Sequence, residues 1–91
     1  MIKEPLVSVV INCYNGEEFI GAAINSVLTQ TYQNFEIVFF DNMSTDQTRA
    51  IVTKYTDIRV KYFCSDKHVS LGIARNLALT KTSGEYISFL D

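Results

Sequence analysis

Apolar and polar residues alternate along this chain in blocks, and the blocks predict strands and helices in turn. Four short stretches rich in β-branched and aromatic residues predict strands, at residues 6–11, 35–40, 59–63 and 85–90. The second stretch is apolar nearly throughout, which is typical of a strand buried on both faces of a parallel sheet. The third alternates charged and apolar residues, which favours a strand at the edge of the sheet.

Between these strands, apolar residues recur at helical spacing and predict three helices. Asn15 followed by Glu18, and Ser44 followed by Gln47, match the capping-box pattern, so we expect these residues to start the first two helices. Gly84 is expected to cap the end of the third helix.

The order of these elements predicts the fold class. Strands that alternate with helices form α/β folds with a parallel sheet and right-handed crossovers. With the third strand at an edge, the most economical strand order is 3-2-1-4, with helices on both faces and a switch point between the first and fourth strands. We expect residues 1–91 to be a single subdomain, and a truncated one, because nothing follows to cover the last strand.

Composition excludes several classes of protein. The chain has 91 residues, is 47% hydrophobic, carries a net charge of −2 and has no basic run, so we expect no nucleic-acid partner. No stretch approaches the roughly 20 apolar residues of a membrane span. Cys13 and Cys64 have neither metal-ligand spacing nor a disulfide pattern, and we expect both to be reduced and at least partly buried in a cytoplasmic protein.

Candidate chemistry lies where the first two strands end. The first turn, residues 12–16, has one glycine, too few for a dinucleotide fingerprint, and it lacks the lysine of a P-loop. Tyr14 offers a ring for stacking on a base, although covering the helix start is an equally good interpretation. Asp41 and Asn42 can accept hydrogen bonds from a base or ribose, or bond their own turn instead. Caps at Ser44 and Gln47 would free both side chains to face the switch point.

The sequence also suggests roles for three further polar residues. Arg75, at the start of the third helix, can reach a diphosphate or form a structural ion pair. Asp91, at the end of the fourth strand, would hold a divalent ion only together with a second acid. His68 is a lone histidine in a polar loop, and we expect it to be a surface residue. The tyrosines elsewhere are expected to be half-buried packing residues, namely Tyr32, Tyr55 and Tyr62.

Together, five segments resemble the family 2 glycosyltransferases, which are inverting sugar-nucleotide enzymes with the GT-A fold. The resemblance covers essentially the whole chain, in the right order and spacing, at residues 7–16, 26–32, 40–46, 72–76 and 84–91. It implies that the chain is the Rossmann-like, nucleotide-binding half of a GT-A fold.

The resemblance also implies roles for particular residues. The first turn would hold the nucleotide base and ribose through Asn12, Tyr14 and Asn15, with Tyr14 as the stacking ring. Asp41 and Asn42 match the acidic pair after the second strand, whose second member accepts a hydrogen bond from uracil. Two departures matter here: Asn12 replaces the commonest proline, and Asn42 replaces the more usual aspartate.

The remaining implied roles concern phosphate and metal. Gly72 and Arg75 match the segment close to the diphosphate, and Asp91 matches the first aspartate of the Asp-x-Asp motif that binds Mg²⁺ or Mn²⁺. The second metal aspartate and the catalytic base would lie beyond Asp91. We therefore expect the 91-residue chain to be catalytically inactive by itself.

The function implied by the resemblance is transfer of a sugar from a nucleoside diphosphate sugar, a UDP-sugar by expectation, to a hydroxyl of a glycan, lipid or protein acceptor. Polysaccharide biosynthesis in the cytoplasm, or at the inner face of the membrane through further segments, would suit such an enzyme. One alternative is a non-catalytic nucleotide-binding module that self-associates through its open sheet edge. Another is a fragment of a Rossmann-like oxidoreductase, which the missing glycines make a poor fit.

Overall fold

The computed structural model describes residues 4–90, and its elements follow the predicted alternation of strands and helices. They are β1 (Val7–Cys13), α1 (Ile20–Leu28), β2 (Phe35–Asp41), α2 (Thr48–Thr53), β3 (Val60–Cys64), α3 (Leu71–Leu79) and β4 (Tyr86–Phe89). Within residues 4–90, no helix is long and apolar enough to cross a membrane.

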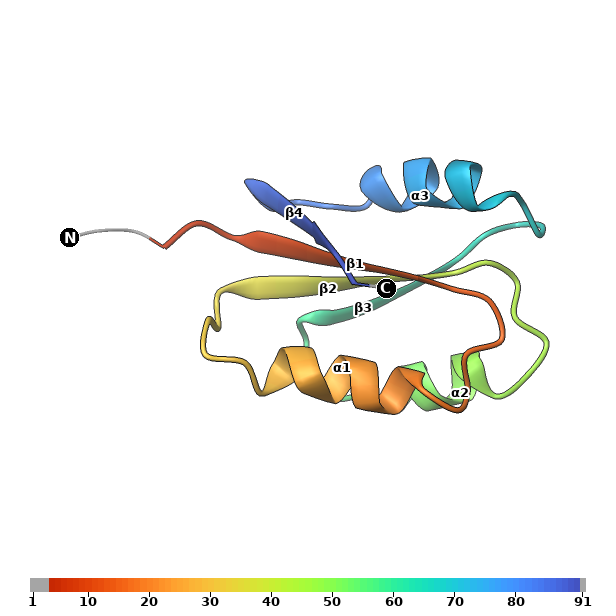
Figure 1. Ribbon diagram of the computed structural model, residues 1–91, viewed down its shortest axis with the longest axis horizontal. Helices are drawn as coiled ribbons and strands as arrows, with labels where there is room; N and C mark the ends of the chain where they lie inside the picture. The colour runs from red at the N-terminus through yellow and green to blue at the C-terminus, as the bar shows by residue number, and fades with distance from the viewer. Residues whose placement is uncertain (1–3, 91) are drawn as a thin grey trace.

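The strands form one four-stranded sheet in the order β3-β2-β1-β4, as predicted. All neighbouring pairs are parallel, and the register sets Cys13 of β1 opposite Asp41 of β2. Helices α1 and α2 cover one face of the sheet and α3 covers the other (Figure 1). The turns that leave β1, β2 and β3 gather at the same end of the molecule, which is where a parallel α/β sheet binds ligands (Figure 1).

The core has two parts, one on each face of the sheet, because side chains of a strand alternate between faces. Val9, Ile11, Ile37 and Phe39 pack toward α1 and α2. The intervening residues of the two strands pack toward α3, in a smaller cluster of Val10, Val38, Phe40, Ala74 and Ala78. The same alternation decides which strand-end residues face α3, and it governs the site described below.

The starts of α1 and α2 differ from the predicted capping boxes. Helix α1 begins at Ile20, several residues after Asn15, and its N-cap residue Phe19 makes no side-chain cap. Helix α2 begins at Thr48, with Gln47 at the N-cap position and again no side-chain cap. The predicted local caps at Asn15 and Ser44 are therefore wrong, because both side chains bond a neighbouring turn.

Gly84 is also not a helix cap. Helix α3 ends at Leu79, and none of the described glycines has a positive φ. A Cβ on Gly84 would lie 2.7 Å from the backbone nitrogen of Ser8 and 2.8 Å from the carbonyl oxygen of Leu6. Glycine is needed here because the turn before β4 passes directly against β1.

A buried carboxylate ties the other end of the sheet together. Glu36, 3% exposed, accepts hydrogen bonds from Ser8 Oγ at 2.5 Å, Ser83 N at 2.6 Å and Lys61 Nζ at 2.7 Å. Burial alone would raise the pKa of Glu36, but the bonds from Lys61, Ser8 and Ser83 outweigh burial and hold that pKa below its usual range. Glu36 therefore links β1, β2, β3 and the turn before β4.

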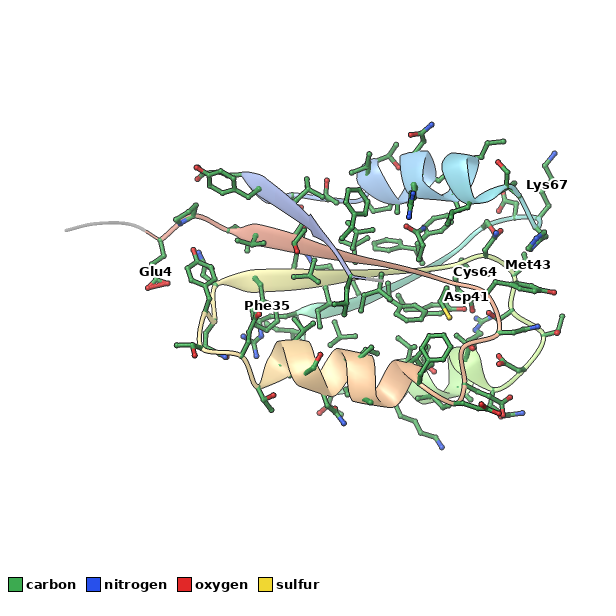
Figure 2. The ribbon with its side chains drawn as sticks, viewed as in Figure 1. Glu4, Phe35, Asp41, Met43, Cys64 and Lys67 are labelled. Atoms are coloured by element: carbon green, nitrogen blue, oxygen red, sulfur yellow. The ribbon has the colours of Figure 1, made fainter. Side chains whose placement is uncertain are left out.

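The two cysteines are unpaired and lie in different surroundings. Cys13 is buried, and its pKa is raised by burial and then by the charge of Asp41. Cys64 is exposed at the end of β3, which differs from the expected partial burial, and its Sγ lies 3.8 Å from Met43 Sδ. Figure 2 shows Asp41, Met43 and Cys64 together at the end of the sheet opposite Phe35.

Candidate functional site

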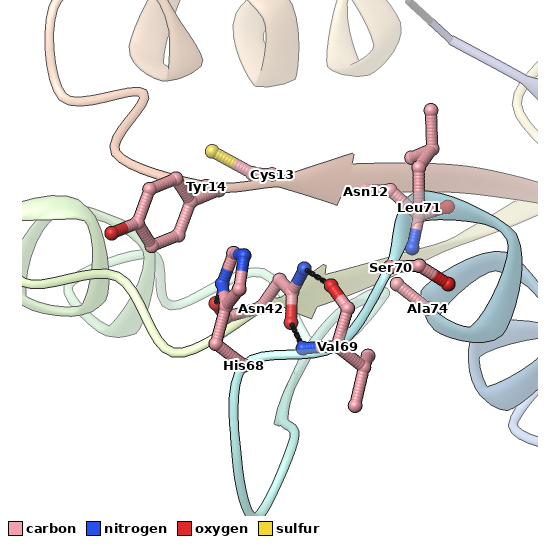
Figure 3. Close-up of a pocket in the computed structure, with 9 residues that line it drawn as sticks. All are labelled: Asn12, Cys13, Tyr14, Asn42, His68, Val69, Ser70, Leu71 and Ala74. Carbon is pink, nitrogen blue, oxygen red and sulfur yellow. Dashed lines mark hydrogen bonds between the residues drawn. The ribbon is translucent and has the colours of Figure 1, made fainter.

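A cavity of about 280 Å³ opens where β1 and β2 end and α3 begins. Such a position, beyond the carboxyl ends of parallel strands, is the usual ligand site of an α/β sheet. Figure 3 shows the side chains that line it: Asn12, Cys13, Tyr14, Asn42, His68, Val69, Ser70, Leu71 and Ala74. The structure thus brings together three of the predicted site residues, which are Asn12, Tyr14 and Asn42.

Two rings form one wall of this cavity. Tyr14 follows β1 and has a half-exposed side chain, and its ring centroid lies 4.5 Å from that of His68 in an edge-on arrangement. His68 Nδ1 lies 3.0 Å from the carbonyl oxygen of Asn42, so Nδ1 carries the hydrogen of this bond. His68 is exposed, as predicted, but it also lines the cavity, which the sequence did not indicate. Its only sequence signal is its place in the loop that follows β3.

Both polar atoms of the Asn42 carboxamide form hydrogen bonds inside the protein. Its Nδ2 donates to the carbonyl oxygen of Val69 at 2.7 Å, and its Oδ1 accepts from Val69 N at 2.9 Å and from Ser65 Oγ at 3.3 Å. Figure 3 shows the two bonds to Val69. An aspartate could not donate to Val69, so asparagine suits this position. The side chain fixes the loop that enters α3, and its contact with a base stays a prediction.

Asp41 lies on the opposite face of the sheet from Asn42, because it continues the alternation of β2. Its carboxylate is 1% exposed and accepts hydrogen bonds from Ser44 N at 2.9 Å and Tyr62 Oη at 2.6 Å. Burial, and then the hydrogen bond to Asp41, raise the pKa of Tyr62. Asp41 does not line the cavity, and Ser44 does not free its carboxylate, contrary to the sequence interpretation.

The turns after β1 and β2 brace each other through reciprocal hydrogen bonds. Asn15 N donates to Ser44 Oγ at 2.8 Å, and Asn15 Oδ1 accepts from Thr45 N at 2.7 Å. Glu17 N donates to Asp46 Oδ2 at 3.1 Å. We call these five residues the turn brace. Asn15 has a φ of 53°, a left-handed conformation that asparagine tolerates better than most residues. The turn brace fixes the backbone next to Tyr14.

A second cavity, of about 190 Å³, adjoins the first and extends between β1, β4 and α3. It is lined by Val10, Asn12, Leu71, Arg75, Phe89 and Leu90. Asn12 and Leu71 line both cavities, so the two spaces meet at these side chains. Arg75 lines this second cavity, and its contact with a diphosphate stays a prediction. Gly72 lines neither cavity, and a Cβ there would meet nothing within 4 Å.

The metal ligand predicted from the sequence, Asp91, lies outside the described residues. Across residues 4–90, no group of three or more histidine, cysteine, aspartate or glutamate side chains could hold a metal ion. The described part of the chain therefore offers no complete metal site of its own.

The sequence of residues 8–91 matches the family model described as Glycosyl transferase family 2. The chain belongs to glycosyl transferase family 2. Among curated relatives in the family, it is 43% identical over 86 residues to the Escherichia coli UDP-Glc:alpha-D-GlcNAc-diphosphoundecaprenol beta-1,3-glucosyltransferase WfgD, covering 94% of this chain and 34% of that protein. It is 32% identical over 93 residues to glycosyltransferase GlyA of Streptococcus pneumoniae, covering 100% of this chain and 13% of that protein.

Solved structures of glycosyltransferases share the fold of this family 2 chain. S. aureus TarS 1-349 in complex with UDP-GlcNAc superposes with a TM-score of 0.87 at 36% identity, covering 93% of this chain and 26% of that chain. The mannosyltransferase PcManGT of Pyrobaculum calidifontis, in complex with GDP-Man and Mn²⁺, superposes with a TM-score of 0.85 at 25% identity and the same two coverages. The fold is the Rossmann-like half of the GT-A fold, as the motifs implied, and it spans about a third or less of these relatives.

Proposed function

We propose that this family 2 chain is the nucleotide-binding part of an inverting glycosyltransferase. The enzyme would move a sugar from a nucleoside diphosphate sugar, with UDP as the expected nucleotide, to a hydroxyl of a glycan, lipid or protein acceptor. The observation that carries the proposal is the cavity at the carboxyl end of the sheet, with the Tyr14 ring on its wall. UDP-Glc in the name of one relative and UDP-GlcNAc in one solved structure support the choice of UDP.

The two cavities suggest how such a donor would lie. The first cavity, about 280 Å³, suits a nucleoside, whose base would stack on Tyr14. The second leads toward Arg75, whose guanidinium can donate charge-assisted hydrogen bonds to a diphosphate. Gly72 leaves open space at the start of α3, so a diphosphate could pass close to the backbone there.

Sugar transfer needs more than these residues supply. A divalent ion, when bound, neutralises the charge of the departing diphosphate, and a carboxylate general base takes the proton of the acceptor hydroxyl. Residues 4–90 form no metal site by themselves. In our proposal Asp91 contributes one ligand for Mg²⁺ or Mn²⁺, and the 91-residue chain alone binds nucleotide weakly without transferring sugar.

The exposed edge of the sheet supports a second candidate function. Strand β4 lies at an edge, where Tyr86 is 61% exposed and Phe89 is about half exposed. An exposed apolar edge strand is a surface for pairing with another chain. In this alternative the chain is a non-catalytic nucleotide-binding module that oligomerises through β4. Size-exclusion chromatography tests it, since this alternative requires an oligomer whose size is independent of concentration.

The donor proposal is tested by titrating the ¹⁵N-labelled chain with UDP, with and without Mn²⁺, and separately with NAD. We expect UDP to shift the backbone amides of the turn at residues 12–16 and the loop at residues 65–70. Tyr14→Ala should weaken UDP binding by about tenfold or more, and Tyr14→Phe should retain it, because phenylalanine keeps the stacking ring. Tyr86→Ala is the matched control, since Tyr86 lines neither of these cavities. Shifts with NAD and none with UDP would overturn the proposal.

A further inference from the structure

Asn12 carries a buried polar atom in the site that has no partner. It is the second-last residue of β1, and the alternation of the strand turns its side chain toward α3. Its Nδ2 is the only buried side-chain nitrogen or oxygen without a hydrogen-bond partner among residues 4–90. Buried polar groups are nearly always paired in folded proteins, because leaving a donor unsatisfied costs free energy. An unpaired amide at the junction of two cavities therefore calls for an explanation.

We propose that the Asn12 carboxamide donates a hydrogen bond to an oxygen of the bound nucleotide, where the ribose joins the diphosphate. This inference rests on the proposed function and adds a contact to it. Asn12 lines the cavity that holds Tyr14 and also the cavity that holds Arg75. A nucleoside diphosphate that occupies both cavities must therefore pass Asn12 with its ribose–phosphate segment, which is rich in hydrogen-bond acceptors.

The contrast with Asn42 supports a ligand role rather than a structural one. Two bonds to Val69 hold the Asn42 carboxamide in place, so each of its polar atoms has a partner within the protein. No bond inside the described chain satisfies the Asn12 nitrogen. Leu71 lines both cavities together with Asn12 and is 55% exposed, so its side chain is not locked in the core.

The test measures UDP binding by calorimetry on the 91-residue chain and on two variants, Asn12→Ala and Asn12→Asp. We expect Asn12→Ala to weaken UDP binding by about five- to tenfold, the loss of one hydrogen bond. Asn12→Asp should weaken it further, because a carboxylate replaces the donor and repels the phosphates. The melting temperature of unliganded Asn12→Ala should stay the same or rise, since the substitution removes a buried donor that has no partner.

Asn25 provides the matched control, because it lies in helix α1 on the other face of the sheet. Its Oδ1 accepts a hydrogen bond from Tyr55 Oη at 2.9 Å, so Asn25→Ala should lower the melting temperature and leave UDP binding unchanged. If both Asn12 variants bind UDP like the unaltered chain, this inference is wrong while the proposed function stands. This inference is also wrong, and the proposed function stands, if Asn12→Ala melts at a lower temperature than the unaltered chain and binds UDP normally. If the unaltered chain binds no UDP, with or without Mn²⁺, the proposed function fails and this inference fails with it.

Discussion

Asn12 and Asn42 lie at the carboxyl ends of neighbouring strands and on the same side of the sheet, yet their carboxamides behave in opposite ways. Both polar atoms of the Asn42 side chain form hydrogen bonds with the backbone of Val69, which fixes the loop before α3. Asn12 leaves its nitrogen unpaired between two cavities. Asp41, one residue before Asn42, faces the other side and bonds Tyr62. Residue type alone therefore does not decide a role here. The face of the strand and the partners available on that face decide it.

Gly72 gives a direct test of the diphosphate path at the residue scale. A Cβ at Gly72 would meet no atom within 4 Å, so Gly72→Ala should fold normally. Because alanine favours helix over glycine, we expect α3 to gain up to about 0.5–1 kcal/mol of stability. If the diphosphate passes over this position, the same variant should bind UDP more weakly and uridine equally well. Calorimetry with both ligands measures this, and equal UDP affinity would remove Gly72 from the site.

The sequence predicts where each strand ends, but it does not predict which face of the sheet a strand-end residue occupies. The end of a strand can be located from its composition, so the sequence predicts Asn12, Tyr14 and Asn42 at the strand ends, where the cavity lies. The face on which a strand-end residue lies depends on how far the strand continues. Because β2 continues through Asp41, the alternation takes its carboxylate away from the cavity. His68 was read only as a surface residue, because its contact with Tyr14 joins two loops that are distant in the sequence.

At the scale of elements, the turn brace replaces the local caps that the sequence predicted. A capping box pairs residues three apart, whereas Asn15 pairs with Ser44 and Thr45 in another turn. The predicted polar residues do bond backbone amides, but these amides belong to the neighbouring turn and not to the first turn of their own helix. The sequence predicts the helices and strands because each one has apolar residues, at a regular spacing, that pack into the core. The partner of a polar turn residue depends on which turns the sheet brings together.

The turn brace predicts different outcomes for two substitutions of Asn15. Asn15→Gly loses the bond to Thr45 but accepts the φ of 53°, and we expect a loss of about 1 kcal/mol. Asn15→Ala loses the same bond and also strains the left-handed backbone, so we expect it to lose about 1 kcal/mol more. Urea unfolding measures both free energies. If the two variants lose the same free energy of unfolding, the φ of 53° does not strain alanine at this position.

At the scale of the whole molecule, the two ends of the sheet differ in structure. The carboxyl end carries both cavities, while the amino end is closed by the network around Glu36. Glu36 reaches β1 through Ser8, β3 through Lys61 and the turn before β4 through Ser83. The sheet order was predictable from the alternating edge pattern of β3, but this network was not. A lone glutamate in an apolar strand gives no sign of which donors will surround it.

The Glu36 network makes the stability of the whole sheet depend on pH. Because the folded protein holds the pKa of Glu36 below its usual range, the ionised form stabilises the fold at neutral pH. That contribution is complete above the usual glutamate pKa of about 4.3 and is lost as the pH falls through the lowered value. Glu36→Gln should therefore cost about 1–3 kcal/mol at pH 7, since Lys61 loses its buried partner, and should flatten the fall in stability below pH 5.

Asp57 supplies the control that separates this effect from general acid unfolding. Its hydrogen bonds with Arg59 lower its pKa to about 2, so its contribution falls away only as the pH drops from about 4 toward 2. Between pH 5 and 7, the stability of Asp57→Asn should change with pH as it does in the unaltered chain. The slope of stability against pH should differ only at lower pH. Urea unfolding at a series of pH values measures all three proteins. If Glu36→Gln keeps the full acid dependence of the unaltered chain, the ionised Glu36 network does not hold the sheet together. In that case the lost stability at pH 7 would come from packing around the side chain, and Asp57→Asn would change the acid slope more than Glu36→Gln does.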